Sequence, residues 1–280
     1  MMKSLLAANR SEKDSFRIPH SVQQSIPVRR IYTDGIWQVG QKYSKTWRFS
    51  DINYAASSLD DRRSIFRSYG AVLNSLPTDA TAKITIINRR LNPVDFQRTM
   101  LMPECNDGLD YYRGEYNQII LDKAAESNNL VQEKYITLSI GLRKIEQTRA
   151  YFRRVDTNLS ASFGRLDSGA YAISCADRLR LLHDFFRPGE DASFRFDLSA
   201  NIKRGIDFRD LICPDGLQFR AGYFEMGAKF GRVLFMRDYA SFISDEMIKD
   251  LSDFSRNLLL SIDILPIPTE EAVREVQSRI

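Results

Sequence analysis

The stretch KYSKTWRFSDINY, residues 42–54, sets four aromatic rings among lysine and arginine, and the fold expected for the chain follows from it. Side chains alternate along a strand, so Tyr43, Trp47 and Phe49 share one face of a strand that spans Tyr43 to Phe49. Residues 35–39 supply its hairpin partner across Gly-Gln-Lys. Such a strand suits either a packed core or a platform on which nucleic-acid bases stack.

The segments that follow alternate between helical and extended patterns. The sequence predicts helices over 58–76, 109–125, 145–159, 178–186 and 244–254 and from 269, strands over 82–91, 133–142, 169–174 and 257–265, and a second hairpin over 221–237. The clearest helical stripe consists of Ile145, Thr148, Phe152, Val155 and Leu159. Hairpins with returning helices indicate an α+β fold, in which antiparallel or mixed sheets carry helices on one face.

The order of these elements also predicts the domain organisation. Residues 1–27 are polar and lack periodicity, so we expect a mobile lead-in, followed by an α+β domain over 28–268. Hairpin, helix, strand and helix occur in that order near both ends of the chain. This order raises the alternative of two related units, 28–130 and 205–268, separated by a middle insertion. Residues 269–280 then begin a linker helix.

Composition excludes several classes of protein. The 40 basic residues nearly balance the 36 acidic ones, unlike the clustered basic surface of a dedicated nucleic-acid binder. Three scattered cysteines and two histidines lack the paired spacing of metal ligands, and suit a reducing cytoplasm. The chain has no run of about 20 apolar residues, the length that a membrane-spanning helix needs.

No pattern in the sequence predicts catalysis. The glycines at 227 and 231 lack the spacing of a phosphate-binding loop and lead into a strand, which predicts a hairpin turn. His183 and Asp184 are adjacent on a predicted helix, so they point about 100° apart and are expected to be structural. The acidic pairs at 60–61 and 270–271 fall in first helical turns, where carboxylates favour the helix dipole.

The aromatic stretch itself lacks the glycine of the known aromatic RNA-binding pattern. The interpretation as core or subunit interface is therefore favoured over base stacking, and both stay open. If a surface is present here, its candidates are Trp37, Tyr43, Trp47 and Arg48 of the predicted amino-terminal hairpin.

Several short motifs follow one another along residues 21–280. They are Gln24, Ile26-Pro27, Tyr32, Asp34-Gly35-Ile36, Tyr43, Lys45-Thr46, Phe49 and Asp51-Ile52-Asn53-Tyr54, then Arg178-Leu179, Leu182-His183, Phe186, Pro188, Asp210-Leu211-Ile212, Pro214, Gly227, Lys229-Phe230-Gly231 and Pro266. In this order the chain resembles the VirB-four-like conjugal transfer ATPases of type IV secretion systems, in the form carried by integrative conjugative elements of Gram-positive bacteria.

The resemblance implies an amino-terminal domain and not the motor. Members of the family are longer and carry Walker A and B sequences, which this chain lacks, so ATP and Mg²⁺ are expected only in a motor domain and no cofactor or metal is expected here. It further implies a cytoplasmic protein at the inner face of the membrane and hexameric assembly. The expected partners are membrane subunits of the channel and other copies of the ATPase, reached without direct membrane insertion. Single-stranded nucleic-acid binding is the alternative function.

Overall fold

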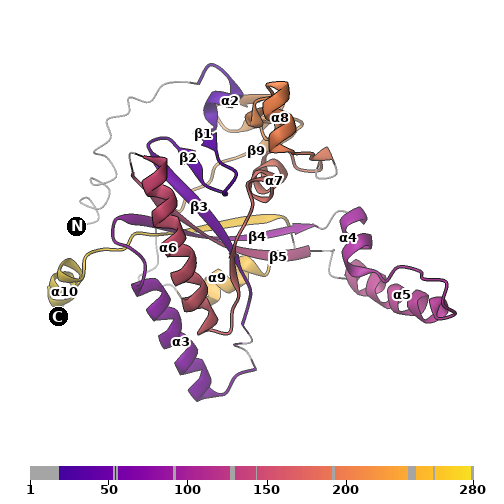
Figure 1. The fold of residues 1–280 in the computed structure, drawn as a ribbon, viewed down its shortest axis with the longest axis horizontal. Helices are drawn as coiled ribbons and strands as arrows, with labels where there is room; N and C mark the ends of the chain where they lie inside the picture. Colours follow the sequence, from indigo (N-terminus) through magenta and orange to yellow (C-terminus); the bar gives the residue numbers. More distant parts are fainter. Residues whose placement is uncertain are drawn as a thin grey trace.

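A seven-stranded antiparallel sheet forms the centre of the molecule (Figure 1). The computed structural model describes residues 19–52, 54, 56–90, 93–126, 130–142, 144–190, 193–238, 244–254 and 256–278. The strands lie in the order β1 (Val28–Ile31), β2 (Trp37–Val39), β3 (Lys42–Phe49), β5 (Leu130–Ile140), β4 (Ala80–Arg90) and β10 (Leu258–Ile264), and β6 (Ala170–Ala172) also pairs with β3. The α+β class with antiparallel sheets is therefore confirmed.

Two helices cover one face of this sheet. They are α3 (Leu59–Asn74), whose first turn is capped by the Ser58 hydroxyl, and α6 (Ile145–Gly164). The predicted stripe of α6 is confirmed, because Thr148, Phe152, Val155 and Leu159 are all buried. They pack with Tyr43 and Trp47 of β3 and with apolar side chains of β5, and this first core joins helix and sheet.

A third helix contacts the other face of the sheet at β3. Helix α7 (Cys175–Phe186) begins with a capping box between Ser174 and Asp177. The Arg178 guanidinium donates hydrogen bonds to the backbone oxygen of Ser44 (3.0 Å) and to its hydroxyl (2.8 Å). Ser44 alternates with Tyr43 along β3, so α7 lies opposite α6.

The second core forms beneath α7. It buries Trp37 against Leu179 and Ile212, the residue that follows the short helix η2 (Phe208–Leu211). Ile26, which follows α2 (Val22–Ser25), is buried there too. The predicted lead-in therefore extended too far, because residues 22–26 are part of the fold; residues 1–18 of that segment lie outside the described residues.

The two units raised as an alternative share one sheet. Strand β5, from the supposed insertion, lies at the centre of the sheet between β3 and β4. Strand β10 pairs with β4 from Leu258–Asn88 to Ile264–Ala82, and so completes the same sheet. Asn88 also donates to the backbone oxygen of Ser252 (2.6 Å), at the end of α9 (Asp245–Ser252).

Three short strands form a separate small sheet, and two further helices, α8 (Leu198–Arg204) and α10 (Thr269–Gln277), complete the described body of the chain. The strands are β7 (Leu217–Phe219), β8 (Phe224–Met226) and β9 (Lys229–Gly231). Helix α10 begins where the sequence predicted it. Gly227 adopts φ +55° at the β8–β9 turn, so this glycine serves a hairpin, as predicted.

Helices α4 (Pro93–Met100) and α5 (Asp110–Glu126) form an arm that projects from the end of the long β4–β5 pair (Figure 1). We call residues 93–126 the arm. Within it, Asn117 exchanges two hydrogen bonds with the backbone of Met102, at 2.8 and 2.9 Å. Arg113 pairs with Asp107 (2.5 Å) and Asp110 (2.6 Å), and these contacts fix the loop between the helices.

Candidate functional site

The aromatic hairpin lies inside the molecule and not on its surface. The Trp47 side chain is only 1% exposed, and its ring lies 5.9 Å from that of Phe152 on α6. Its Nε1 donates a hydrogen bond to Asp156 (2.6 Å), and the same carboxylate accepts a bond from the buried Lys45 ammonium (2.8 Å). Strand β3 is thus held against α6 by the packing of Trp47 on Phe152 and by the Asp156 carboxylate, which accepts hydrogen bonds from two β3 side chains.

Trp37 is buried in the second core. The guanidinium carbon of Arg178 lies 4.3 Å from the centre of its ring, a cation–π contact. Burial lowers the pKa of Arg178. Its hydrogen bonds to Ser44 satisfy two of the buried N–H donors of the guanidinium. Neither face of the Trp37 ring is open to a partner, because α7 covers it within the chain.

The predicted surface of Trp37, Tyr43, Trp47 and Arg48 is therefore corrected. The three rings are buried in the chain's own two cores, and they can serve neither as surface anchors nor as a stacking platform on β3. Arg48 is the partly exposed member, and its guanidinium lies 3.3 Å from the carboxylate of Glu133. Arg48 is thus part of an ion cluster within the fold.

That ion cluster joins three strands and a helix. Glu133 on β5 is buried and accepts hydrogen bonds from Arg89 of β4 (2.9 Å) and from the Tyr135 hydroxyl (3.1 Å). Burial alone would raise the pKa of Glu133, but the hydrogen bond and charge of Arg89 outweigh it, and the pKa is lowered. Arg89 also lies 3.9 Å from Asp184 on α7. The cluster holds α7 to the sheet.

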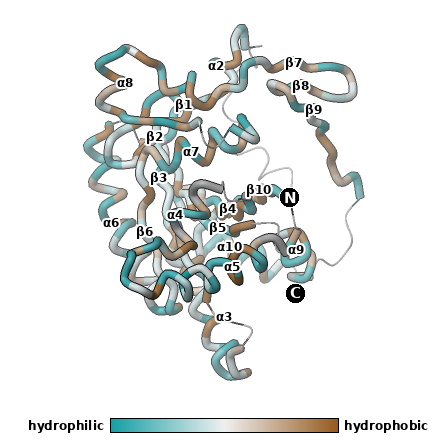
Figure 2. The backbone as a smooth tube through the Cα atoms, turned by 90° about the vertical axis from the view of Figure 1, so that its right-hand side faces the viewer, coloured by the Kyte–Doolittle hydropathy of each residue, from teal (hydrophilic) through white to brown (hydrophobic). Residues whose placement is uncertain are grey.

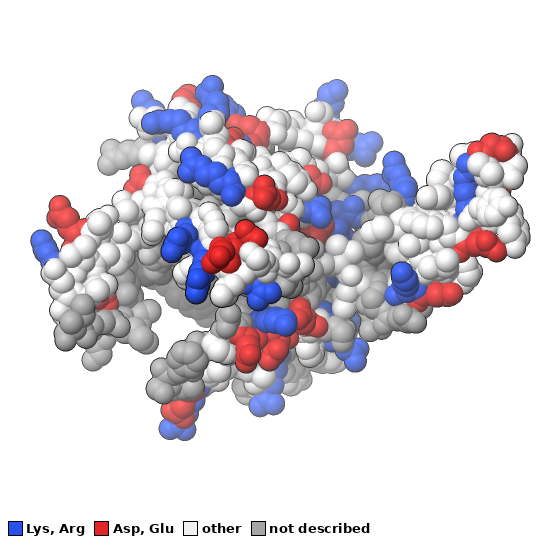
Figure 3. All heavy atoms as spheres, turned by 90° about the horizontal axis from the view of Figure 1, so that it is seen from below, with Lys and Arg blue, Asp and Glu red and all other residues white. Residues whose placement is uncertain are grey.

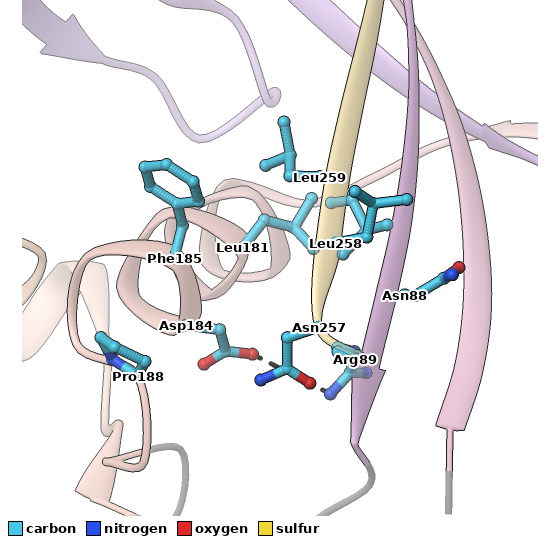
Figure 4. Close-up of a pocket in the computed structure, with 10 residues that line it drawn as sticks. Asn88, Arg89, Leu181, Asp184, Phe185, Pro188, Asn257, Leu258 and Leu259 are labelled. Carbon is cyan, nitrogen blue, oxygen red and sulfur yellow. Dashed lines mark ion pairs between the residues drawn. The ribbon is translucent and has the colours of Figure 1, made fainter. Parts of the chain in front are cut away.

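A pocket of about 220 Å³ lies next to this cluster, between α7 and β10 (Figure 4). Apolar side chains make most of its wall, among them Leu181 and Phe185 of α7 and Leu259 of β10. Arg89 and Asp184 contribute charge at one side, where they already pair with each other. The pocket therefore suits an apolar side chain better than a charged ligand.

His183 of α7 is a structural histidine, as predicted. His183 is buried and its Nδ1 lies 3.3 Å from Asp184, the neighbour predicted to be structural. Its ring packs on Phe194, with ring centres 5.1 Å apart. Among the residues that the structure describes, no group of three His, Cys, Asp or Glu side chains could hold a metal ion. No helix in the described ranges is long and apolar enough to cross a membrane.

The arm carries several exposed aromatic and apolar side chains. Its exposed apolar side chains are Met100, Met102, Leu109, Tyr111, Tyr112, Tyr116, Ile119 and Leu121. Four of them, Leu109, Tyr112, Tyr116 and Ile119, follow one another at helical spacing. In the structure these four residues are between 44% and 65% exposed. Figure 3 shows the arm standing clear of the body. A contiguous exposed apolar surface of this kind marks an interaction site.

The charge of the arm is the second property of this surface. Residues 93–126 contain seven acidic residues and three basic ones. The hydrogen bond from Arg113 lowers the pKa of Asp107, and the backbone N–H of Cys105 together with Arg113 lowers that of Asp110. Both carboxylates are therefore charged at neutral pH. The arm thus carries an excess of acidic residues beside its exposed aromatic side chains.

Removing the carboxylate of Asp107 is expected to loosen the arm. Asp107→Asn should speed amide hydrogen exchange in residues 101–113 at neutral pH, whereas Glu115→Gln, at an exposed site on α5, should not. The pKa of Asp107 is lowered in the folded chain, so its carboxylate stabilises the arm at pH values above the unfolded pKa of about 3.9. This stabilisation is lost as the pH falls through the folded pKa. The difference between variant and wild type should therefore vanish in acid. Equal exchange in both at neutral pH would contradict this role.

Comparison with known proteins does not identify the chain. No protein-family model matches it, and no curated protein is significantly similar to it.

Proposed function

We propose that the chain is a non-catalytic docking and assembly domain of a conjugative type IV secretion ATPase. In this proposal it contacts membrane subunits of the channel and neighbouring copies of the ATPase, at the inner face of the cell membrane. The observation that carries the docking role is the arm, a pair of helices that projects from the body (Figure 1) and carries exposed aromatic side chains. The resemblance of the sequence motifs supplies the identity of the machine.

The arm has the properties of a protein-docking element. Tyrosine rings provide large contact area at low conformational cost and are frequent anchors at interfaces. Tyr111 and Tyr112 are each well over half exposed. The next residue, Arg113, pairs with Asp107 of the preceding loop and so holds the start of α5 in place. A partner therefore meets a surface that is already ordered.

The charge of the arm favours a protein partner over the lipid surface. An arm with more acidic than basic residues is repelled by the anionic lipids of a cytoplasmic leaflet, which attract basic segments. The cytoplasmic segments of membrane proteins carry an excess of Lys and Arg. Exposed apolar side chains on an acidic arm therefore complement a basic membrane subunit, and this supports peripheral attachment through protein contacts.

The docking test uses the purified chain, a membrane subunit of the same channel in nanodiscs, and anionic liposomes without protein. We expect retention on the subunit and none on bare liposomes. Replacing Tyr112 and Ile119 by serine should weaken retention at least about tenfold, a loss of roughly 1.4 kcal/mol of binding free energy, because both side chains lie on the same exposed stripe. The melting temperature should not change, since neither side chain is buried.

A matched control distinguishes docking through the arm from non-specific binding through exposed aromatic residues. Phe66 on α3 is as exposed as Tyr111 and lies outside the arm, so Phe66→Ser should leave retention unchanged. Binding to bare liposomes, or unchanged retention of the Tyr112→Ser, Ile119→Ser variant, would refute the proposal. Tight binding of single-stranded DNA at physiological salt would favour the nucleic-acid alternative instead.

A further inference from the structure

An extended apolar segment follows β9 and has no partner among the described residues. Residues 233–236 are Val-Leu-Phe-Met, and their side chains are between 60% and 85% exposed. Figure 2 shows the segment leaving the small sheet as a run of hydrophobic residues. The sequence predicted this run to be part of the second hairpin, but β9 ends at Gly231. Four consecutive exposed apolar residues of this kind are unfavourable unless they bind something.

An open strand edge lies elsewhere on the same chain. Strand β10 is the last strand in the described order of the large sheet, and β4 pairs with one side of it only. On its other side, β10 presents unpaired backbone groups, which can accept a further strand. The pocket lined by Leu181, Phe185 and Leu259 opens at the amino-terminal end of this edge (Figure 4).

Backbone chemistry favours a strand as the partner of the segment. An extended chain inserted into a bilayer would leave its N–H and C=O groups without hydrogen bonds, which is costly in hydrocarbon. Pairing with a strand edge satisfies these groups and buries alternate side chains in neighbouring pockets. The segment therefore needs a β-strand edge.

Charge favours β10 over a second copy of the segment itself. Antiparallel pairing of two such segments about their centre would place Arg232 of one copy opposite Arg237 of the other, and like charges directly opposite are destabilising. Strand β10 instead carries Asp263, whose side chain is more than half exposed beside Lys83. Arg232 can pair with this carboxylate.

We propose that residues 232–236 of one copy add as an antiparallel strand to the β10 edge of a second copy of this chain. With Arg232 opposite Asp263, Leu234 lies opposite Ser261 and Met236 opposite Leu259, where its flexible side chain enters the pocket. This inference rests on the assembly part of the proposed function. Donor and acceptor are different surfaces, so the contact is head-to-tail and builds a ring or a chain of copies.

The first test measures self-association of the full chain by analytical ultracentrifugation over a wide range of concentrations. The wild type should associate, and the donor variant Phe235→Asp and the acceptor variant Leu259→Lys should each be monomeric. An equimolar mixture of the two variants should form a dimer, because each keeps the half that the other lacks. Ile202→Asp, at an exposed site on α8, should associate like the wild type.

The second test fixes the register and does not depend on how the acceptor variant folds. In a Cys105→Ser background, a Leu234→Cys chain mixed with a Ser261→Cys chain should give a disulfide-linked pair under mild oxidation. Both positions are exposed, so neither change affects a core. The cysteines Cys175 and Cys213 are buried in the fold.

Three outcomes would overturn the proposal. They are a monomeric wild type at every concentration, an acceptor variant that associates while the donor variant does not, and Leu234→Cys chains that link only to each other. Docking is measured separately, on the monomeric Phe235→Asp variant, through the arm. A failure of docking with intact self-association therefore refutes only the membrane-subunit contact, and the reverse refutes only the strand addition.

Discussion

Trp47→Ala is expected to destabilise the chain by about 3–5 kcal/mol, the usual cost of truncating a large buried aromatic side chain to alanine. Trp47 fills the first core between the sheet and Phe152, and the change leaves a cavity there. It also removes the indole N–H that donates to Asp156, which then keeps only the bond from Lys45. Urea unfolding followed by circular dichroism measures the loss.

A surface ring on the same sheet provides the control for Trp47. Tyr171 on β6 is more than half exposed, and Tyr171→Ala should change the unfolding free energy by no more than about 0.5 kcal/mol. If Trp47→Ala left the stability unchanged and abolished oligonucleotide binding, the ring would be a stacking platform and its placement in the core would be wrong.

Local pattern was sufficient to predict the longer helices and much of the first core, but it did not predict α2, α4 or α8. The stripe of α6 could be read from spacing alone, because each buried residue lies three or four positions from the last, and Phe152 and Leu159 are buried as the stripe requires. The alternation along β3 likewise placed Tyr43 and Trp47 on one buried face. Such features depend only on neighbours in the sequence.

Sheet order and the second covered face depend on contacts between distant residues. Nothing local in β10 indicates that Leu258 pairs with Asn88, 170 positions earlier. Trp37 looked available for docking because the helix that covers it, α7, lies more than 130 residues later in the chain. The sequence did not reveal the pairing of β10 or the covering of Trp37, because periodicity shows which side of an element is apolar but not which element covers it.

The interaction surface was hidden for the same reason. On α5, Tyr112 and Ile119 lie at a spacing that packed helices also show, so the sequence does not reveal whether this side is covered. In the structure that side is exposed at the end of β4 and β5. Apolar residues at helical spacing are therefore equally compatible with a core and with a docking surface.

Glu133→Gln is expected to destabilise the chain by about 3 kcal/mol, at the lower end of the range for breaking a buried ion pair. The change leaves the guanidinium groups of Arg89 and Arg48 without their shared carboxylate. The loss stays at the lower end because both arginines retain some contact with solvent, at 22% and 40% side-chain exposure. Asp263→Asn, which breaks an exposed pair with Lys83, should cost no more than about 1 kcal/mol.

The pH dependence of stability tests the same carboxylate without relying on one substitution. The pKa of Glu133 is lowered in the folded chain, so its contribution is present above the unfolded pKa of about 4.3 and is lost as the pH falls through the folded value. The free energy of unfolding of the wild type should therefore fall more steeply in acid than that of Glu133→Gln. The double variant Glu133→Gln, Arg89→Met should regain part of the loss at neutral pH, since it no longer buries an unpaired charge. Parallel pH profiles for wild type and Glu133→Gln would show that the Glu133 carboxylate does not hold α7 to the sheet.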